Sequence, residues 1–319
     1  MMEQIQPILF TPATKSYLWG GTTLLAKWGK TSPEATVAEC WELSAYAGCE
    51  SVARGGDCDG MSLGEIVETH PELFGAAVGE GGFPILVKLI DAAKDLSVQV
   101  HPDDLYARVH EGDNGKTEMW YIADAVPGAA IYYGFSRNVS RGEVEKSIRE
   151  NTVTTLLQKV PVTKGDAFLV PAGTVHALLA GVTVIEIQES SNVTYRVYDY
   201  DRRDKDGNPR QLHIGKALEV MQFCPREVAE KKTVTTVAPG VTERKLACCH
   251  YFRTSEIRIE DGTYEIAPKD TFATFTVARG TGIFTEDGRE IKKGQTWLVP
   301  NGCSARIQGK GLTLVTTVV

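Results

Sequence analysis

Several kinds of segment are missing from this sequence of 319 residues. No apolar run approaches the roughly 18 to 20 residues of a membrane-spanning helix, so we expect no membrane partner. Residues 1–7 contain no basic stretch followed by an apolar core, so no secretory signal is indicated and we expect a cytoplasmic location. The remaining composition, 42% hydrophobic and 24% charged, is typical of a globular protein.

Cysteine pairs and basic runs are also missing. The seven cysteines include no C-x-x-C pair, which argues against a disulfide framework and against a cysteine-only zinc site. The formal net charge is -7, and no run of five or more lysines and arginines occurs. We therefore expect no nucleic-acid partner. A few cations inside a pocket can still bind a negatively charged small molecule.

Most of the chain has the sequence pattern of β-strands. Alternating apolar and polar residues, with Gly, Pro, Asn and Asp at intervals of about ten residues, predict a mainly β fold. Helical patterns are limited to a stretch that opens on Ser62, a stretch that opens on Ser140, and residues 212–223. We expect short helices within 140–160 to cover the mouth of the β structure as a partial lid.

An internal repeat predicts two related β units. The pattern Gly165-x5-Pro171-x-Gly173-x2-His176 recurs as Gly294-x5-Pro300-x-Gly302-x2-Ala305. We place a catalytic unit at 1–223, a connecting segment at 224–244 and a second unit at 245–319, because 224–244 is polar and contains turn residues. Since alanine replaces the histidine in the second copy, only the first unit keeps that side chain for chemistry.

Two histidines, a glutamate and a glutamine of the first unit predict a metal site. Gln99 and His101 are two residues apart, so on a strand both side chains point to the same face. His176 follows a Pro-x-Gly turn, and Glu118 opens an apolar segment. This donor set suits Zn²⁺, with Mn²⁺, Fe²⁺ and Co²⁺ as competitors, and leaves coordination positions for substrate. Taken alone, each histidine is more often a structural residue, as we expect for the other four.

The spacing around His176 resembles the second conserved motif of the cupin family. A strand leads to a turn made by proline and glycine, and the next strand begins with a histidine that points inward. The chain departs from the motif at Ala180, where many cupins have asparagine. The resemblance implies two cupin-type jelly-roll β-barrels with a few short helices.

Five segments in order resemble type I mannose-6-phosphate isomerase, most closely its short bacterial form; they are 83–91, 96–104, 115–120, 170–177 and 193–202. The resemblance extends from Trp19 to Gly302, which is nearly the whole chain. It implies one zinc ion held by Gln99, His101, Glu118 and His176. It also implies catalytic roles for Arg196 and Lys116, substrate contacts near the sugar phosphate for Lys88 and Ser97, and a place in the lining of the substrate pocket for Glu39.

The implied reaction interconverts mannose 6-phosphate and fructose 6-phosphate. It moves a proton between C2 and C1 and needs stabilisation of the charge on enediol-type oxygens, which a metal ion and Arg196 can provide. The proton-transfer group stays open between Lys116, a metal-bound water and Glu39. Lys116 is equally a candidate contact for substrate oxygens, and nearby acids could place Arg196 in a structural ion-pair network.

Two other functions are compatible with the same ligands. One is a cupin oxygenase that uses Fe²⁺, and the other is a sugar-binding module without enzymatic activity. The Lys-x-Glu segment and Arg196 have no obvious role in the oxygenase, and an open metal site would be superfluous in the sugar-binding module. For the isomerase we expect a small sugar-phosphate partner and a monomeric chain.

Overall fold

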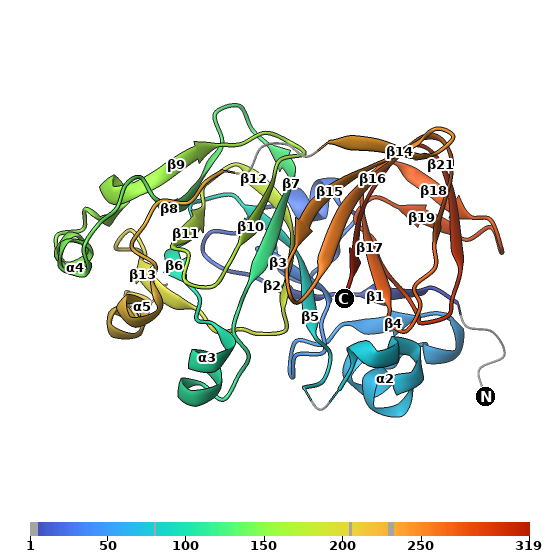
Figure 1. Ribbon diagram of the computed structural model, residues 1–319, viewed down its shortest axis with the longest axis horizontal. Coiled ribbons are helices and arrows are strands. Elements are labelled where there is room, and N and C mark those ends of the chain that lie inside the picture. Colours follow the sequence, from blue (N-terminus) through green and yellow to red (C-terminus); the bar gives the residue numbers. More distant parts are fainter. Residues whose placement is uncertain (1–5, 80, 204–205, 229–232) are drawn as a thin grey trace.

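The computed structural model describes residues 6–79, 81–203, 206–228 and 233–319. Antiparallel strands dominate these ranges and form two β units (Figure 1). The mainly β, cupin-type fold predicted from the sequence is therefore confirmed. In the described ranges, no helix has the length and apolar character needed to cross a membrane.

The first unit consists of two sheets. The six-stranded sheet has the order β10-β7-β12-β5-β3-β2. Its strands span Ala167–Val170, Glu118–Ala125, Val182–Glu189, Ile85–Ala92, Glu39–Leu43 and Ala13–Lys15. The five-stranded sheet has the order β13-β6-β11-β8-β9. Its strands span Tyr195–Tyr198, Val98–Val100, His176–Leu178, Ala130–Phe135 and Leu157–Pro161.

The second unit is a ten-stranded sheet with the order β14-β15-β16-β21-β17-β20-β1-β4, beside which β18 pairs with β19 and β21. From β14 to β21 in chain order, the strands of this unit span Val234–Ala238, Val241–Cys248, Arg253–Ile266, Ala273–Arg279, Thr281–Phe284, Glu290–Lys292, Thr296–Val299 and Ala305–Val318. The N-terminal strands β1 and β4 span Ile8–Thr11 and Val52–Arg54. The segment 224–244 thus contains β14 and the start of β15, and the division of the chain at these boundaries stays a prediction.

The internal repeat extends to the order and register of the strands. The order β10-β7-β12-β5-β3-β2 in the first unit corresponds to β20-β17-β21-β16-β15-β14 in the second. In the first unit Val170 pairs with Glu118. The equivalent residue Val299 pairs with Ala273. Ala273 therefore takes the position of Glu118 in the second unit.

The same register locates the other metal-ligand positions. His176 pairs with Gln99 in the first unit, and Ala305 pairs with Ile266 in the second. The second unit therefore has Ile266, Pro268, Ala273 and Ala305 where the first has Gln99, His101, Glu118 and His176. All four polar positions are apolar in the second unit, which leaves the first unit as the one that can bind a metal there.

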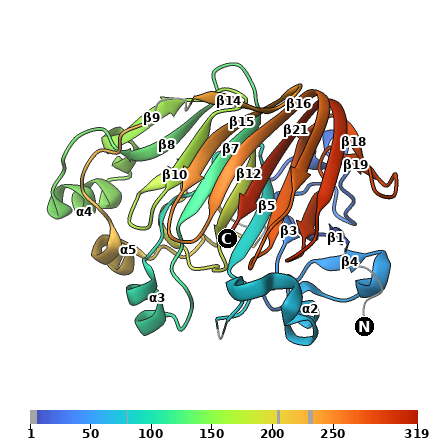
Figure 2. The same cartoon turned by 45° about the vertical axis from the view of Figure 1, so that its right-hand side comes forward.

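Alternation along the central strands separates two faces of the six-stranded sheet. Val87 and Ile187 pack in one apolar cluster with residues of the second unit, including Phe272. Figure 2 shows β5, β7 and β12 alongside the strands of this second unit. Because side chains alternate along a strand, Lys88 and Glu186 point to the opposite face, toward the interior of the first unit.

The helices are short and lie outside the sheets. The α-helices α1 to α5 span Thr23–Lys27, Leu63–Thr69, Asp104–His110, Arg141–Arg149 and Ile214–Val220, and the 3-10 helices η1 to η3 span Gly56–Cys58, Pro71–Ala77 and Val153–Leu156. The predicted capping box of Ser62 and Glu65 is formed at the start of α2. The helix expected at 212–223 is shorter in the structure, where α5 begins after His213 and ends before Met221.

The helical insertion covers a different surface from the one expected. Val144 and Ile148 of α4 pack with Val98 of β6 in an apolar cluster. Val98 alternates with Gln99, so α4 lies on the outer face of the five-stranded sheet. No residue of 140–160 lines the cavity of the first unit. The prediction that this segment forms a lid is therefore wrong, because its apolar face is already buried against the sheet.

A glycine pair allows a test of how the two units pack. Gly294 has a φ of +87°, and an added Cβ would lie 2.1 Å from the carbonyl oxygen of Trp28. Gly302 has a φ of +74° but has no neighbour within 4 Å of an added Cβ. We expect Gly294→Ala to lower the free energy of unfolding by about 3 kcal/mol and Gly302→Ala by about 1–2 kcal/mol. Urea denaturation measures both changes, and equal losses would contradict the tight contact at Gly294.

Candidate metal centre

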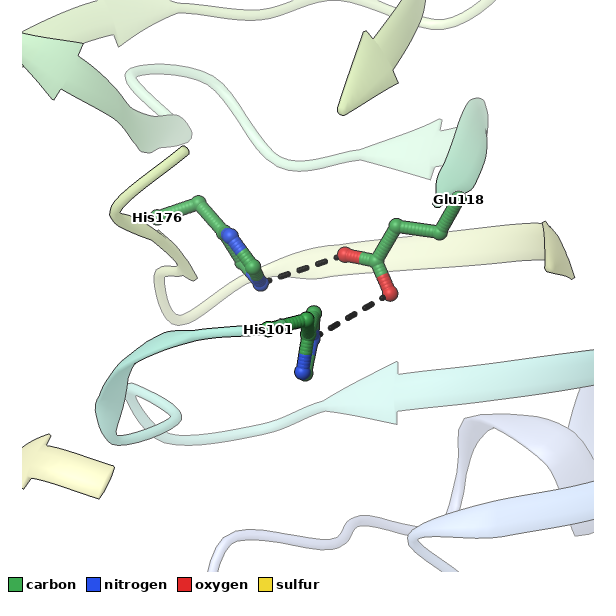
Figure 3. A group of neighbouring side chains, drawn as sticks. All are labelled: His101, Glu118 and His176. Atoms are coloured by element: carbon green, nitrogen blue, oxygen red, sulfur yellow. Dashed lines mark ion pairs between the residues drawn. The ribbon is translucent and has the colours of Figure 1, made fainter. Parts of the chain in front are cut away.

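Three buried side chains from separate elements meet inside the first unit (Figure 3). Glu118 opens β7, His176 opens β11, and His101 directly follows β6. The Nε2 atom of His176 lies 3.1 Å from Oε1 of Glu118, and Nε2 of His101 lies 3.5 Å from Oε2. The potential ligand atoms all lie within 4.8 Å of one another, a spacing that a single metal ion can bridge.

Backbone carbonyls orient both imidazole rings. Nδ1 of His101 lies 2.8 Å from the oxygen of Val193, and Nδ1 of His176 lies 2.8 Å from the oxygen of Thr174. Because a carbonyl only accepts hydrogen bonds, each Nδ1 carries the proton and each Nε2 keeps its lone pair. This is the usual orientation of metal-binding histidines.

The polar atoms that face the centre lack ordinary partners. Nε2 of His101 and both carboxylate oxygens of Glu118 are buried and form no hydrogen bond of ordinary geometry among the described residues, although Oε2 of Glu118 lies within ion-pair distance of Lys116. Burying polar atoms without hydrogen bonds costs free energy. Two imidazole nitrogens and a carboxylate are also the donors that Zn²⁺ binds. The residues therefore fit a metal ion.

The charge states of these side chains suit metal binding. Burial, followed by the charge of Lys116, lowers the pKa of His101 to about 3. Burial also lowers the pKa of His176. Burial alone would raise the pKa of Glu118, but Lys116 and the two histidines hold it well below its usual range. At neutral pH the chain thus presents neutral imidazoles and a carboxylate, the forms that bind a metal ion.

Gln99 lies beside this group. Its Nε2 atom is 3.4 Å from Nε2 of His176. Rotation of the amide about its last bond would turn the oxygen toward the same place, since the two ends of an amide are similar in size. Gln99 is thus placed to be a fourth ligand, and this role stays a prediction.

A cavity of about 290 Å³ adjoins the centre. All predicted site residues other than the three buried ligands line it, namely Glu39, Lys88, Ser97, Gln99, Lys116 and Arg196. The structure adds polar and aromatic lining residues that the sequence did not single out, namely Tyr17, Trp19, Trp120, Glu186, Asn192, Thr194 and Arg210. The cavity therefore combines cations, carboxylates and aromatic rings, a lining suited to a polar, charged ligand.

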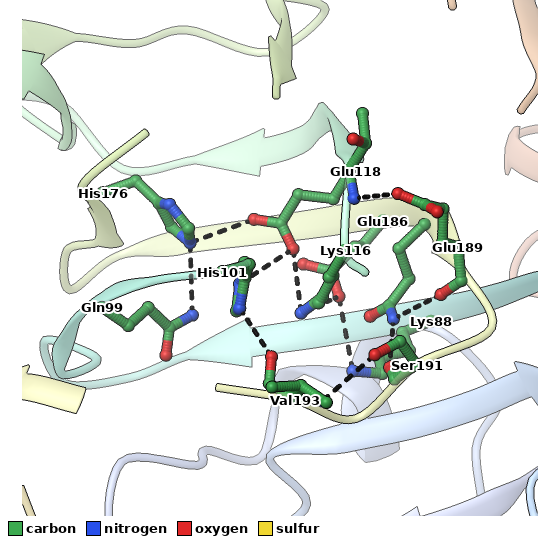
Figure 4. A network of polar contacts seen from close by, with 12 residues as sticks. Lys88, Gln99, His101, Lys116, Glu118, His176, Glu186, Glu189, Ser191 and Val193 are labelled. Atoms are coloured by element: carbon green, nitrogen blue, oxygen red, sulfur yellow. Dashed lines mark hydrogen bonds and ion pairs between the residues drawn. The ribbon is translucent and has the colours of Figure 1, made fainter. Parts of the chain in front are cut away.

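Glu186 is the carboxylate that connects the two lysines (Figure 4). Its Oε1 lies 3.4 Å from Nζ of Lys88 and 4.0 Å from Nζ of Lys116. Trp120 donates a hydrogen bond from Nε1 to Oε2 at 2.9 Å. Burial, followed by the charge of Glu118, raises the pKa of Glu186. The sequence offered one signal for Glu186, namely a charged residue in the middle of the otherwise largely apolar strand Val182–Glu189.

Each lysine in the cavity contacts two carboxylates. Nζ of Lys116 lies 2.9 Å from Oε2 of Glu118, in addition to its contact with Glu186. Nζ of Lys88 lies 3.9 Å from Oε2 of Glu39, in addition to its contact with Glu186. Trp41 donates a hydrogen bond to Glu39 at 2.8 Å. Three carboxylates against two lysines leave this end of the cavity negative, and a divalent cation would offset that charge.

Arg196 is held by neutral groups. Its Nε atom donates to Oγ of Ser97 at 3.2 Å, and its Nη1 atom donates to the carbonyl of Gln211 at 2.9 Å. Within the described ranges, no carboxylate forms an ion pair with it; Asp199, the nearby acid, pairs with Arg202 and Arg210 instead. The alternative of a structural ion-pair network around Arg196 is therefore not supported.

Known proteins are similar to this chain in sequence and in fold. A family model described as the catalytic domain of type I phosphomannose isomerase matches residues 8–131. The mannose-6-phosphate isomerase ManA of Bacillus subtilis is 39% identical over 301 residues, which cover 93% of this chain and 94% of the relative. This chain belongs to the type I phosphomannose isomerase family. The predicted family is thus confirmed.

Solved phosphomannose isomerase structures agree with this assignment. The mannose 6-phosphate isomerase of Bacillus subtilis superposes with a TM-score of 0.91 at 36% identity, covering 98% of this chain and 99% of that one. A mannose 6-phosphate isomerase bound with zinc and yttrium has the same fold, with a TM-score of 0.74 at 16% identity over 98% of both chains. Membership in the phosphomannose isomerase family confirms the predicted aldose-ketose isomerase and does not favour the oxygenase or the sugar-binding module.

Proposed function

We propose that this chain interconverts mannose 6-phosphate and fructose 6-phosphate with one zinc ion held by Gln99, His101, Glu118 and His176. The observation that carries this proposal is the cluster of buried ligand atoms that lack hydrogen bonds, beside a cavity lined by cations and carboxylates. When bound, the metal supplies a Lewis acid that stabilises negative charge on substrate oxygens. Mn²⁺, Fe²⁺ and Co²⁺ are competitors for the same donors.

Arg196 lies at the reaction end of the cavity. It pairs in register with Gln99, a proposed metal ligand, and its side chain contacts Ser97. A guanidinium in this place can stabilise the developing charge on the oxygen of an enediol-type intermediate. Ser97 then acts by orienting Arg196.

Glu186 is the best placed group for proton transfer. Its carboxylate is buried, lines the cavity and lies within reach of Lys116. A base in this position can move a proton between C2 and C1 while the ammonium of Lys116 donates hydrogen bonds to the substrate oxygens. Glu39 is held by Trp41 and Lys88, and we assign it a contact with a sugar hydroxyl. Lys88 orients the two carboxylates that it contacts.

A coupled assay tests the proposed function. Purified protein should convert mannose 6-phosphate, with fructose 6-phosphate detected by a coupled reduction, and a chelator should abolish the conversion until Zn²⁺ is restored. Turnover that is insensitive to metal removal would contradict the zinc site. Oxygen uptake without isomerisation would instead support the oxygenase.

Arg196→Ala is expected to lower kcat by about 10²- to 10³-fold, because it removes a donor that stabilises charge in the transition state. The zinc content and the melting temperature should stay close to those of the wild type, since Arg196 is not a proposed ligand. Steady-state kinetics and metal analysis of the same preparation check this prediction. An unchanged kcat would exclude Arg196 from the reaction.

All proposed ligands come from one chain, so we propose that a monomer is active, which sedimentation of the active protein would test. The cytoplasmic location stays a prediction.

A further inference from the structure

Arg210 lines the cavity, yet the proposed reaction makes no use of it. The following inference rests on the proposed function. Arg210 follows a turn region and comes directly before Gln211, whose carbonyl accepts the hydrogen bond from Arg196. The Arg210 side chain therefore belongs to the same wall as Arg196 but is carried by a different segment.

A shared carboxylate fixes the position of Arg210. Nε of Arg210 donates to Oδ2 of Asp199 at 2.8 Å, and Nη2 donates to Oδ1. Arg202 also donates to Oδ1 of Asp199. Asp199 is buried, whereas Arg210 is only partly buried. One carboxylate thus holds two guanidinium groups, so a positive charge remains unneutralised by Asp199.

The two arginines of this wall influence each other. Burial, followed by the charge of Arg210, lowers the pKa of Arg196. Both arginines line the same cavity, so a negatively charged ligand there meets two guanidinium groups. Tyr17 lines the same cavity, and both arginines act to lower its pKa against the opposing effects of burial and Glu39.

The other cations that line the cavity are already engaged. Lys88 lies between Glu39 and Glu186, and Lys116 lies between Glu118 and Glu186. A phosphate group approaching either lysine would face two carboxylates, which disfavours its binding there. The wall formed by Arg196 and Arg210 is positive instead, because Asp199 is shared between Arg202 and Arg210. A guanidinium group also matches the geometry of phosphate oxygens.

We propose that Arg210 is a specificity-determining residue that binds the phosphate group of the substrate, and that Asp199 is the positioning residue that holds it. The phosphate then lies at the Arg210 end, and C1 and C2 lie toward Glu118 and Glu186. This assignment moves the phosphate contact away from Lys88, where the family resemblance placed it. The positive charge of Arg196 and Arg210 would then make the cavity favour a phosphorylated sugar over an uncharged one.

The test compares zinc-loaded wild type with Arg210→Ala, Arg210→Lys and Asp199→Asn. We expect Arg210→Ala to raise KM for mannose 6-phosphate about 10- to 100-fold, as for the loss of a hydrogen bond to a charged group, with kcat within about threefold. The inhibition constant of inorganic phosphate should rise in parallel. Arg210→Lys should recover part of the loss, and Asp199→Asn should shift KM in the same direction by less.

Arg203→Ala is the matched control, because Arg203 is an exposed arginine nearby that donates to the carbonyl of Gly207 and does not line the cavity. Its KM should equal that of the wild type. Unchanged KM and unchanged phosphate inhibition in folded Arg210→Ala would overturn the proposal, as would a loss confined to kcat.

If wild type fails to turn over mannose 6-phosphate, the proposed function fails. Calorimetric binding of inorganic phosphate then still tests Arg210, since equal affinity in wild type and Arg210→Ala would overturn its role.

Discussion

Replacing His176 with alanine is expected to reduce zinc affinity and isomerase activity together by more than about 100-fold. His176 is fully buried and points Nε2 at Glu118, so its loss removes a ligand and leaves a carboxylate without a metal partner. Loss of even the groups that orient a metal ligand typically costs 10- to 100-fold in affinity, and loss of the ligand itself should cost more. Elemental analysis after dialysis, with activity measured on the same sample, gives both quantities.

His70→Ala is the control for this experiment. His70 is partly exposed and contacts Glu72 at 3.3 Å, away from the metal centre. Its removal should leave zinc content and turnover unchanged. If His176→Ala retains a full equivalent of zinc while the chain stays folded, the ligand set is wrong.

Glu186→Gln is expected to lower kcat by about 10²- to 10⁴-fold, the range that general acid-base catalysis contributes. Glutamine keeps the size of the side chain, and its carbonyl can still accept the hydrogen bond from Trp120. The substitution removes the negative charge and the ability to accept a proton. Kinetics at saturating mannose 6-phosphate measure the effect.

Glu39→Gln provides the matched comparison, because Glu39 is a second cavity carboxylate that contacts Lys88. We expect it to change KM more than kcat. If Glu39→Gln proved more damaging to kcat than Glu186→Gln, the proton-transfer role would pass to Glu39.

The pH dependence gives an independent check on Glu186. Burial, followed by the charge of Glu118, raises its pKa. Because the ionised carboxylate is the base, wild-type kcat should fall as the pH decreases through this raised pKa. Glu186→Gln should lose that acidic limb of the profile. A variant with the same limb as the wild type would show that another group titrates.

The metal ligands could be predicted because local spacing determines their positions. Gln99 and His101 are separated by one residue, and His176 follows a turn whose proline and glycine are visible in the sequence. Glu118 was included because it opens an apolar, strand-like segment, but its approach to the histidines depends on which strands pair. The structure brings all four together. The strand register also locates their apolar counterparts in the second unit, and among these counterparts only Ala305 was predicted from the sequence repeat.

Glu186 and Arg210 were not predicted, because their contacts are long-range. Glu186 lies in a strand whose eight residues are all buried, and only the pairing with β5 places it opposite Lys88. Arg210 lies in a charged segment that has no regular pattern. Its importance depends on the contact with Asp199, 11 positions away.

The surface that α4 covers and the strand within 224–244 were not predicted for a related reason. The apolar face of α4 predicts burial but does not identify the surface that it covers, which proved to be the outer face of a sheet. The segment 224–244 has a polar, linker-like composition, and β14 within it is an edge strand with four exposed residues out of five. An edge strand exposed on both faces lacks the alternation that marks a half-buried strand.

Titration of metal-free protein with Zn²⁺ tests the central claim most directly, since one ion held by Gln99, His101, Glu118 and His176 should enable the isomerisation. Activity on mannose 6-phosphate is predicted to rise linearly from near zero and to level off at one equivalent of zinc per chain. Full activity in the metal-free protein, or activity that keeps rising to a second equivalent, would contradict it.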